Sequence, residues 1–222
     1  KNGAYMVDGT WITVSVDAGK SWSKPQIIQK EYACSSPVRE LSGGRLMLGL
    51  YKESKGKACG AVAISDDRGR SWRSPVIIDN KGAYLDAETD VIELEDGTIY
   101  AAMRGGRGAD MHWATSSDMG DTWTKSRSMG FPAHCPYLHR CTNGTIVMGT
   151  RLPATSIRLS RNECKTWGES ILVDSHTGAY PSMVNLNDET ALIVYYEEGN
   201  GSNIRAKRFQ IDGDIIRWLP WE

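Results

Sequence analysis

A short motif of the form Ser-x-Asp-x-Gly-x-Ser/Thr-Trp recurs at regular intervals along this chain of 222 residues. Three complete copies occupy residues 15–22, 65–72 and 116–123, and a fourth copy at 160–167 has Asn162 in place of the aspartate. The tryptophans that close the motifs are 50, 51 and 44 residues apart. A period near fifty residues is typical of a propeller blade of four strands. The motif is therefore predicted to mark the same turn in each structural unit.

A second repeated element keeps the same phase as the motif. It is a tight turn between two apolar runs, at residues 42–44, 95–97, 142–144 and 187–189. Asp-Gly and Asn-Gly turns between apolar runs are strong hairpin signals. Each predicted hairpin is followed by one more strand and, in the first three, by the motif turn. Almost no window has helical periodicity, so we predict an all-β fold: a β-propeller of four-stranded antiparallel blades, one domain over residues 1–222.

Charge and cysteine content exclude several function classes. The 26 basic and 27 acidic residues leave no net field that would attract nucleic acid or an anionic membrane surface. No apolar run has the length of a membrane span. The five cysteines form no Cys-x-x-Cys pair, so we expect free buried thiols. Any anion recognition must come from a local cluster of side chains.

Alignment of the four hairpins on their turns predicts where polar side chains meet. The reference position is the last residue of each turn. Nine residues before it, the four hairpins hold Ser35, Glu88, Cys135 and Tyr180. Seven residues after it, they hold Tyr51, Arg104, Arg151 and Tyr196. Positions nearly equidistant from a hairpin turn are cross-strand neighbours, so Glu88 is expected beside Arg104. Cys135 is likewise expected beside Arg151, and Tyr180 beside Tyr196. Radial symmetry would collect these strand ends around one mouth of the central channel.

We interpret this cluster as a functional pocket, because charged and phenolic groups that point at an axis need partners or ligands. The alternative is that Glu88 and Arg104 form a partly buried structural ion pair. That alternative does not explain Arg151, which has no acidic residue at the equivalent position of its hairpin.

The repeated motif resembles the Asp-box, or BNR repeat, of sialidases and several other propellers. In that family the box is a structural turn at the outside of the blade, so Asp17, Asp67 and Asp118 are expected to be structural, with each tryptophan packed between strands. Residues 88–97 running on to Arg104, residues 148–151, and residues 178–182 followed by 192–197 are also similar to sialidase segments. The resemblance covers nearly the whole chain and implies a six-bladed propeller of the sialidase type.

The resemblance implies roles for the pocket residues. Tyr180 would be the nucleophile and Glu88 the base that takes its proton, an exception to the usual glycosidase scheme with two carboxylates. Arg104 and Arg151 would bind the carboxylate of a sialic acid or a related acidic sugar, because a guanidinium forms paired charge-assisted hydrogen bonds. The implied activity is that of an exo-acting, retaining, sialidase-like glycoside hydrolase that needs neither a metal nor an organic cofactor.

Three residues near the predicted mouth are further candidates for substrate contacts. Tyr84 and Asp86 stand in a rim loop just before Glu88, where substrate-binding residues gather, although rim loops are also simply polar. His134 lies beside the mouth as a candidate substrate contact or alternative acid, and a packed loop histidine is the other interpretation.

His134, Cys135, His139 and Cys141 together suggest a zinc site, which we consider and disfavour. The hairpin alignment places His139 and Cys141 at positions that are core elsewhere, and the spacing is not that of a closed four-ligand site. Cys135 as a nucleophile lacks an assigned base, so it is predicted to be a small pocket wall.

Two parts of the sialidase pattern have no counterpart here. Family sialidases carry a third carboxylate-binding arginine and an aspartate acid/base on inner strands of the first blades. Residues 4–29 supply only an outer strand pair with its motif, so we expect the chain to be a fragment whose N-terminal hairpin would precede Lys1. Two other functions stay open: a non-catalytic propeller that binds a glycan or protein, and another uronate-processing enzyme. A secreted or periplasmic location follows by analogy only.

Overall fold

The computed structural model describes residues 8–52, 58–176, 178–186, 189–199, 201–213 and 215–221. The regular elements in these segments are strands: β1 (Gly9–Ile12), β2 (Gln26–Lys30), β3 (Val38–Glu40), β4 (Leu46–Lys52), β5 (Cys59–Ser65), β6 (Val76–Ile77), β7 (Leu85–Glu93), β8 (Ile99–Gly105), β9 (His112–Ser116), β10 (Arg127–Ser128), β11 (Tyr137–Arg140), β12 (Ile146–Thr150), β13 (Thr155–Ser160), β14 (Ile171–Asp174), β15 (Gly178–Asn185), β16 (Thr190–Glu197), β17 (Ile204–Asp212) and β18 (Ile215–Leu219). The all-β prediction is confirmed. Across the described segments, no helix has the length and apolar character needed to traverse a membrane.

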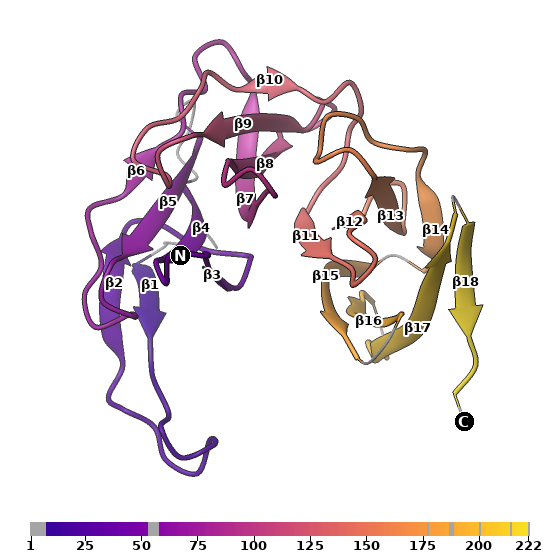
Figure 1. The fold of residues 1–222 in the computed structure, drawn as a ribbon, viewed down its shortest axis with the longest axis horizontal. Helices are drawn as coiled ribbons and strands as arrows, with labels where there is room; N and C mark the ends of the chain where they lie inside the picture. Colours follow the sequence, from indigo (N-terminus) through magenta and orange to yellow (C-terminus); the bar gives the residue numbers. More distant parts are fainter. Residues whose placement is uncertain are drawn as a thin grey trace.

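The strands form antiparallel sheets of four, as the repeat predicts. Blade 1 consists of β3 to β6, blade 2 of β7 to β10, blade 3 of β11 to β14 and blade 4 of β15 to β18, each paired in sequence order. In Figure 1 the first strand of every blade lines the concave side of an open arc, and the fourth strand lies outside. β1 and β2 form a two-stranded sheet beside blade 1. The four-stranded blade is confirmed, and a ring of six blades stays a prediction.

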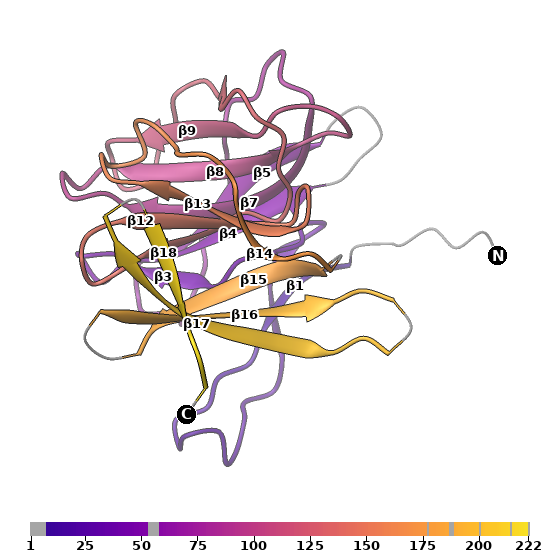
Figure 2. The same ribbon diagram turned by 90° about the vertical axis from the view of Figure 1, so that its right-hand side faces the viewer.

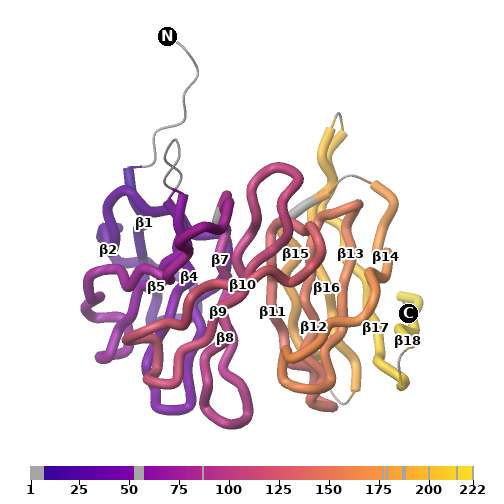
Figure 3. The backbone as a smooth tube through the Cα atoms, turned by 90° about the horizontal axis from the view of Figure 1, so that it is seen from above, coloured from indigo at the N-terminus to yellow at the C-terminus, as the bar shows by residue number. Residues whose placement is uncertain are grey.

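The first two strands of each blade form an inner hairpin that runs from one end of the molecule to the other. In Figure 3 the turns between first and second strands lie at one end, and the connections between second and third strands lie at the opposite end. Gly97 and Gly144 close their hairpin turns with φ of 82° and 84°, a conformation that glycine adopts without steric cost. The fourth turn includes residues 187 and 188, which are outside the described residues.

The hydrophobic core lies between successive blades. Met47 and Ile64 of blade 1, for example, pack in one cluster with Val91 and Met103 of blade 2, and all four side chains are fully buried. Equivalent clusters join blade 2 to blade 3 and blade 3 to blade 4. Figure 2 shows the strands of blade 4 rotated relative to one another by the usual sheet twist. This packing fixes how inner strands of neighbouring blades face each other.

The aspartates of the motif hold the turns, as expected. Asp118 Oδ1 accepts hydrogen bonds from Ser116 Oγ at 2.7 Å and from the Thr122 backbone N–H at 2.8 Å. Its Oδ2 accepts the Thr122 hydroxyl at 2.5 Å. Asp17 and Asp67 make the same three bonds. In the fourth copy Asn162 reproduces this pattern with its amide, donating to Thr166 Oγ1 at 2.8 Å.

The tryptophans of the motif do not all pack as predicted. Trp72, Trp123 and Trp167 lie partly buried against the core clusters. Trp22 is 62% exposed, so the expectation that every motif tryptophan packs between strands is wrong for the first copy. The reason is that β1 and β2 pair with each other and, within the described chain, have no inner strands against which Trp22 would lie.

Replacement of Asp118 by Asn is expected to flatten the loss of thermal stability in acid. Hydrogen bonds from Thr122 and Ser116 lower the pKa of Asp118 to about 2 in the folded chain, against 3.8 ordinarily. A lowered carboxyl pKa contributes stability that is full above the unfolded value and is lost as the pH falls from about 4 to 2. Because Asn162 shows that an amide fits this turn, the variant should fold. Melting temperatures measured between pH 7 and pH 2 test this; an unchanged acid slope contradicts it.

Candidate functional site

Glu88 of blade 2 and Tyr180 of blade 4 form a hydrogen bond across the arc. The Tyr180 phenol donates to Glu88 Oε1, and the backbone N–H of Cys135 donates to Glu88 Oε2 at 2.9 Å. Glu88 is 2% exposed and Tyr180 is 38% exposed, so the carboxylate is buried while the phenol reaches solvent. Burial, and then the hydrogen bond to Glu88, raise the pKa of Tyr180 well above its ordinary value. The phenol is therefore neutral, with its proton directed at a carboxylate.

Both members of this pair lie in irregular parts of their strands. The register between β7 and β8 shifts between Leu85 and Thr89, which places Glu88 inside a bulge. The register between β15 and β16 shifts in the same way around Tyr180, whose φ is 50°. Left-handed backbone costs a non-glycine residue about 1–2 kcal/mol and is concentrated at functional sites. The bulges re-aim the two side chains toward each other.

The Tyr180 ring stacks on the ring of a second tyrosine. Its centroid lies 6.1 Å from that of Tyr196 with 16° between the planes, a stacked arrangement of the two predicted neighbours. The next residue of the chain, Pro181, lies against Gly149 of blade 3. The approach is so close that a Cβ added to Gly149 would lie 2.7 Å from the proline ring. The ring of the nucleophile candidate is thus stacked on one side, and the residue that follows it in the chain is packed closely against blade 3.

Arg104 lies beside Glu88, as the hairpin alignment predicted, and has a second carboxylate partner. Its Nη1 is 3.2 Å from Glu88 Oε1, and its Nη2 is 2.8 Å from Asp86 Oδ2. The guanidinium is largely buried, and its Nε is a buried atom that has no hydrogen-bond partner in the described structure. The expected position of Glu88 beside Arg104 is confirmed, and Asp86 is a second carboxylate partner of the same guanidinium.

Arg151 reaches the same site from the end of β12. Its guanidinium carbon lies 6.0 Å from the centroid of the Tyr180 ring, and its backbone N–H donates to the carbonyl of His134 at 3.1 Å. Its Nη1 is 3.3 Å from Glu198 Oε1, which also accepts the Tyr196 hydroxyl at 3.0 Å. Arg151 therefore has an acidic partner from blade 4. The equivalent position of its own hairpin holds Cys135, as the alignment gave it, so the acidic partner comes from outside that hairpin.

His134 lies among these charges. Its pKa is lowered, first by burial and then by the positive charges of Arg104 and Arg151. The imidazole is therefore neutral near pH 7, which suits a hydrogen-bonding contact better than a proton donor. Tyr84 is 66% exposed at the rim, and its ring covers Gly106 so closely that a Cβ there would lie 2.2 Å from it. The structure thus brings the predicted site residues to one end of the blades.

The cysteine and zinc alternatives find no support in the geometry. Burial, and then the negative charge of Glu88, raise the pKa of Cys135 to about 12, so its thiol is protonated. His139 Nε2 lies 3.0 Å from Asn185 Oδ1, and Cys141 is buried in the core between blades 3 and 4. Among the described residues there is no group of three or more side chains arranged to hold a metal ion. All five cysteines are free thiols, of which Cys34 is exposed.

Hairpin alignment missed three charged residues around the site. Glu198 lies just beyond the end of β16, so the alignment of paired strands does not include it. Its position two residues after Tyr196 could have indicated that it lies near the site. Arg39 and Asp90 form a buried ion pair at 2.5 Å on inner strands of blades 1 and 2. Asp90 lies two residues after Glu88. The apolar residues that follow it led us to predict this stretch as core, so no polar role was assigned to Asp90.

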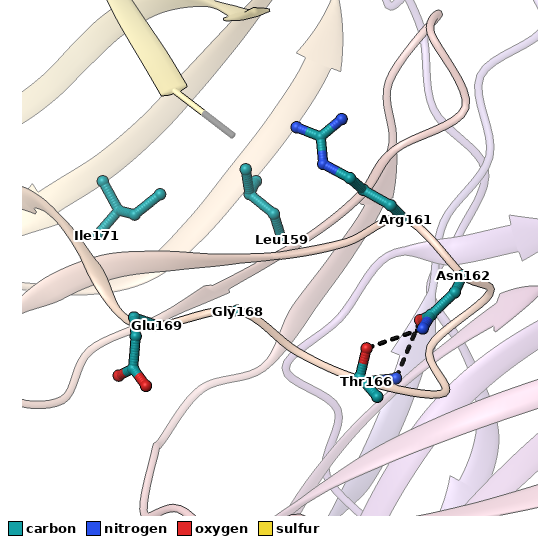
Figure 4. A pocket seen from close by; sticks show the side chains of 7 residues that line it. All are labelled: Leu159, Arg161, Asn162, Thr166, Gly168, Glu169 and Ile171. Carbon is teal, nitrogen blue, oxygen red and sulfur yellow. Dashed lines mark hydrogen bonds between the residues drawn. The ribbon is translucent and has the colours of Figure 1, made fainter. Parts of the chain in front are cut away.

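A pocket lies on the outer side of blade 3, and the residues that line it are separate from the site residues described above. Figure 4 shows its lining, which the imperfect fourth motif contributes together with β13 and β14: Leu159, Arg161, Asn162, Thr166, Gly168, Glu169 and Ile171. Its volume is about 480 Å³. The hydrogen bonds between Asn162 and Thr166 hold the turn itself, so this pocket is a product of the structural motif.

Comparison with known proteins yields both sequence and structural relatives. The sequence profile of the BNR repeat-like domain matches residues 2–194. A sialidase of Bacteroides fragilis (strain YCH46) is 28% identical over 124 residues, which are 51% of this chain and 22% of that protein. This chain thus matches about a fifth of the length of the curated relative.

Solved structures of other proteins share the fold of this chain. A protein of unknown function from Dyadobacter fermentans has a TM-score of 0.80 at 24% identity, covering 92% of this chain and 65% of that one. The intramolecular trans-sialidase from Ruminococcus gnavus, solved with oseltamivir carboxylate, has a TM-score of 0.69 at 21% identity, covering 90% of this chain and 50% of that one. At these identities the likeness shows the fold.

Proposed function

This chain belongs to the BNR repeat-like domain family, and we propose that it is a sialidase-like glycoside hydrolase that removes a terminal sialic acid or a related acidic sugar. The observation that carries the proposal is the hydrogen bond from the Tyr180 phenol to the buried Glu88 carboxylate. A phenol beside a base is the arrangement that activates a tyrosine nucleophile. The sialidase relative supports the class of enzyme.

In the proposed reaction Tyr180 attacks the anomeric carbon of the bound sugar. Its Oη forms a bond to that carbon while Glu88 takes the phenolic proton, and the bond from the carbon to the leaving oxygen breaks, with the leaving oxygen taking a proton from solvent water. A water molecule then displaces Tyr180 from the glycosyl intermediate and gives up a proton to solvent, while Glu88 returns the phenolic proton to the phenolate. Two displacements at one carbon retain its configuration. A neutral nucleophile suits a substrate with a carboxylate next to the reacting carbon, because a carboxylate nucleophile would be repelled there.

The two arginines support an acidic substrate. Arg104 contacts Glu88 and Arg151 lies near the Tyr180 ring, so the planar guanidinium of either can pair with the carboxylate of a bound sugar. His134 is neutral and adds no charge to the two arginines, each of which is paired with carboxylates. Two guanidinium groups beside the nucleophile candidate favour a sugar that carries a carboxylate.

A panel of fluorogenic glycosides tests the proposal. We expect the chain to release the fluorophore from a sialoside or another acidic glycoside and to leave neutral arabinosides and glucosides intact. Nuclear magnetic resonance of the first-formed sugar should show the configuration of the substrate. Binding of the acidic sugar without turnover would favour a non-catalytic glycan-binding propeller. An unsaturated product would indicate a uronate lyase, and preference for a neutral glycoside would contradict the proposed substrate class.

A further inference from the structure

The charge balance of the site is unusual for one that binds an anion. Arg104 and Arg151 supply two positive charges, whereas Asp86, Glu88 and Glu198 supply three negative charges at 3.3 Å or less from them. The cluster therefore carries a net negative charge before any substrate enters. A sugar carboxylate adds a further negative charge, and like charges at such distances repel by several kcal/mol. One of the three carboxylates has to move away when an acidic sugar binds.

Asp86 is the carboxylate that is free to leave Arg104. The Glu88 side chain is 2% exposed and is fixed by Tyr180 and by the Cys135 backbone N–H. The Asp86 side chain is 35% exposed, and it lies at the rim, within the bulge that interrupts pairing between β7 and β8. Rotation of Asp86 into water would release Nη2 of Arg104 without disturbing the Tyr180–Glu88 pair.

We propose that Asp86 is a competing carboxylate that occupies, in the free protein, the position on Arg104 that the substrate carboxylate takes, and that it sets the affinity for acidic ligands. Binding is then an exchange of one carboxylate for another. A neutral sugar that displaced Asp86 would leave Nη2 of a largely buried guanidinium unpaired, a loss that it cannot repay. An acidic sugar replaces the lost contact. Asp86 thereby lowers the affinity for an acidic ligand, which has to displace it, and leaves unchanged the affinity for a neutral ligand that binds with Asp86 still on Arg104. The inference rests on the proposed acidic substrate.

Calorimetric titration of the Asp86→Asn chain tests this role directly. The ligands are free sialic acid and its methyl ester, which differ in the carboxylate alone. Removal of the competing charge is expected to tighten binding of sialic acid by about tenfold. It should leave binding of the methyl ester unchanged within a factor of about two, because the ester gains no ionic contact. Asp86→Ser, measured in the same way, should give the same pattern without an amide at the position.

The control variant is Asp66→Asn, which removes one negative charge from an exposed ion pair with Arg45 in the motif turn of blade 1. It should bind both ligands as the unaltered chain does. Equal or weaker binding of sialic acid by both Asp86 variants would overturn the role of Asp86, as would an equal gain for acid and ester. If the unaltered chain and its Asp86 variants bind neither ligand, the proposed substrate class is itself wrong, and the inference falls with it.

Discussion

Replacement of Tyr180 by Phe is expected to lower kcat/KM for an acidic glycoside by at least about a thousandfold, because it removes the attacking oxygen. The ring itself should stay in place, since Phe keeps the stack on Tyr196 and the contact with Arg151. The expected loss is therefore in kcat, with affinity for the free acidic sugar largely preserved. Initial rates with a fluorogenic sialoside and titration with sialic acid measure the two quantities separately.

Tyr196→Phe is the matched control for this experiment. It deletes a phenolic oxygen in the same site, but that oxygen donates to Glu198 rather than to the base. We expect an effect within about tenfold, the loss of one hydrogen bond. Equal turnover by the Tyr180→Phe chain and the unaltered chain would exclude Tyr180 as the nucleophile.

The second large effect is expected on stability, from Asp90→Ala. Asp90 is fully buried, and its Oδ2 accepts Arg39 Nη2 at 2.5 Å and the Leu138 backbone N–H at 2.6 Å. Arg39 also donates to the Leu138 carbonyl at 2.6 Å and lies over the Tyr137 ring. Inner strands β3, β7 and β11 meet through this group. Removal of Asp90 leaves Arg39 without its counter-charge and should lower the free energy of unfolding by about 3–5 kcal/mol.

Chemical denaturation followed by tryptophan fluorescence measures this difference. Asp66→Ala is the control, because Asp66 also pairs with arginines but its side chain is 50% exposed. An exposed pair contributes no more than about 1 kcal/mol, so the control should stay close to the unaltered chain. A loss for Asp90→Ala as small as that of the control would show that the three-strand contact does not stabilise the blades.

The blade and its phase were predictable because they depend on local chemistry that repeats. Each motif holds its own turn through bonds between residues no more than four positions apart, as Asp118 shows with Ser116 and Thr122. Such a turn forms wherever its sequence occurs. It therefore fixes the spacing of the hairpins and, through them, the pairing of Glu88 with Arg104.

Contacts between blades were less predictable, because they depend on how far each sheet rotates about the axis. Glu88 and Tyr180 are 92 residues apart and belong to blades that are not adjacent in the chain. Alignment placed them at one mouth, but their direct hydrogen bond also needs the bulges at both residues, which no turn signal marks. Glu198 and Asp90 were missed for the same reason: their partners, Arg151 and Arg39, lie on other blades.

The central claim is that Tyr180, with its proton taken by Glu88, is the residue that becomes covalently attached to the sugar. Acid quenching of the working protein, followed by digestion and mass spectrometry, tests it most directly. The prediction is that the peptide containing Tyr180 gains the mass of one acidic sugar residue, and that Tyr180→Phe abolishes this gain. Turnover with the sugar attached to a different residue, or with inverted configuration and no attached sugar, would contradict it.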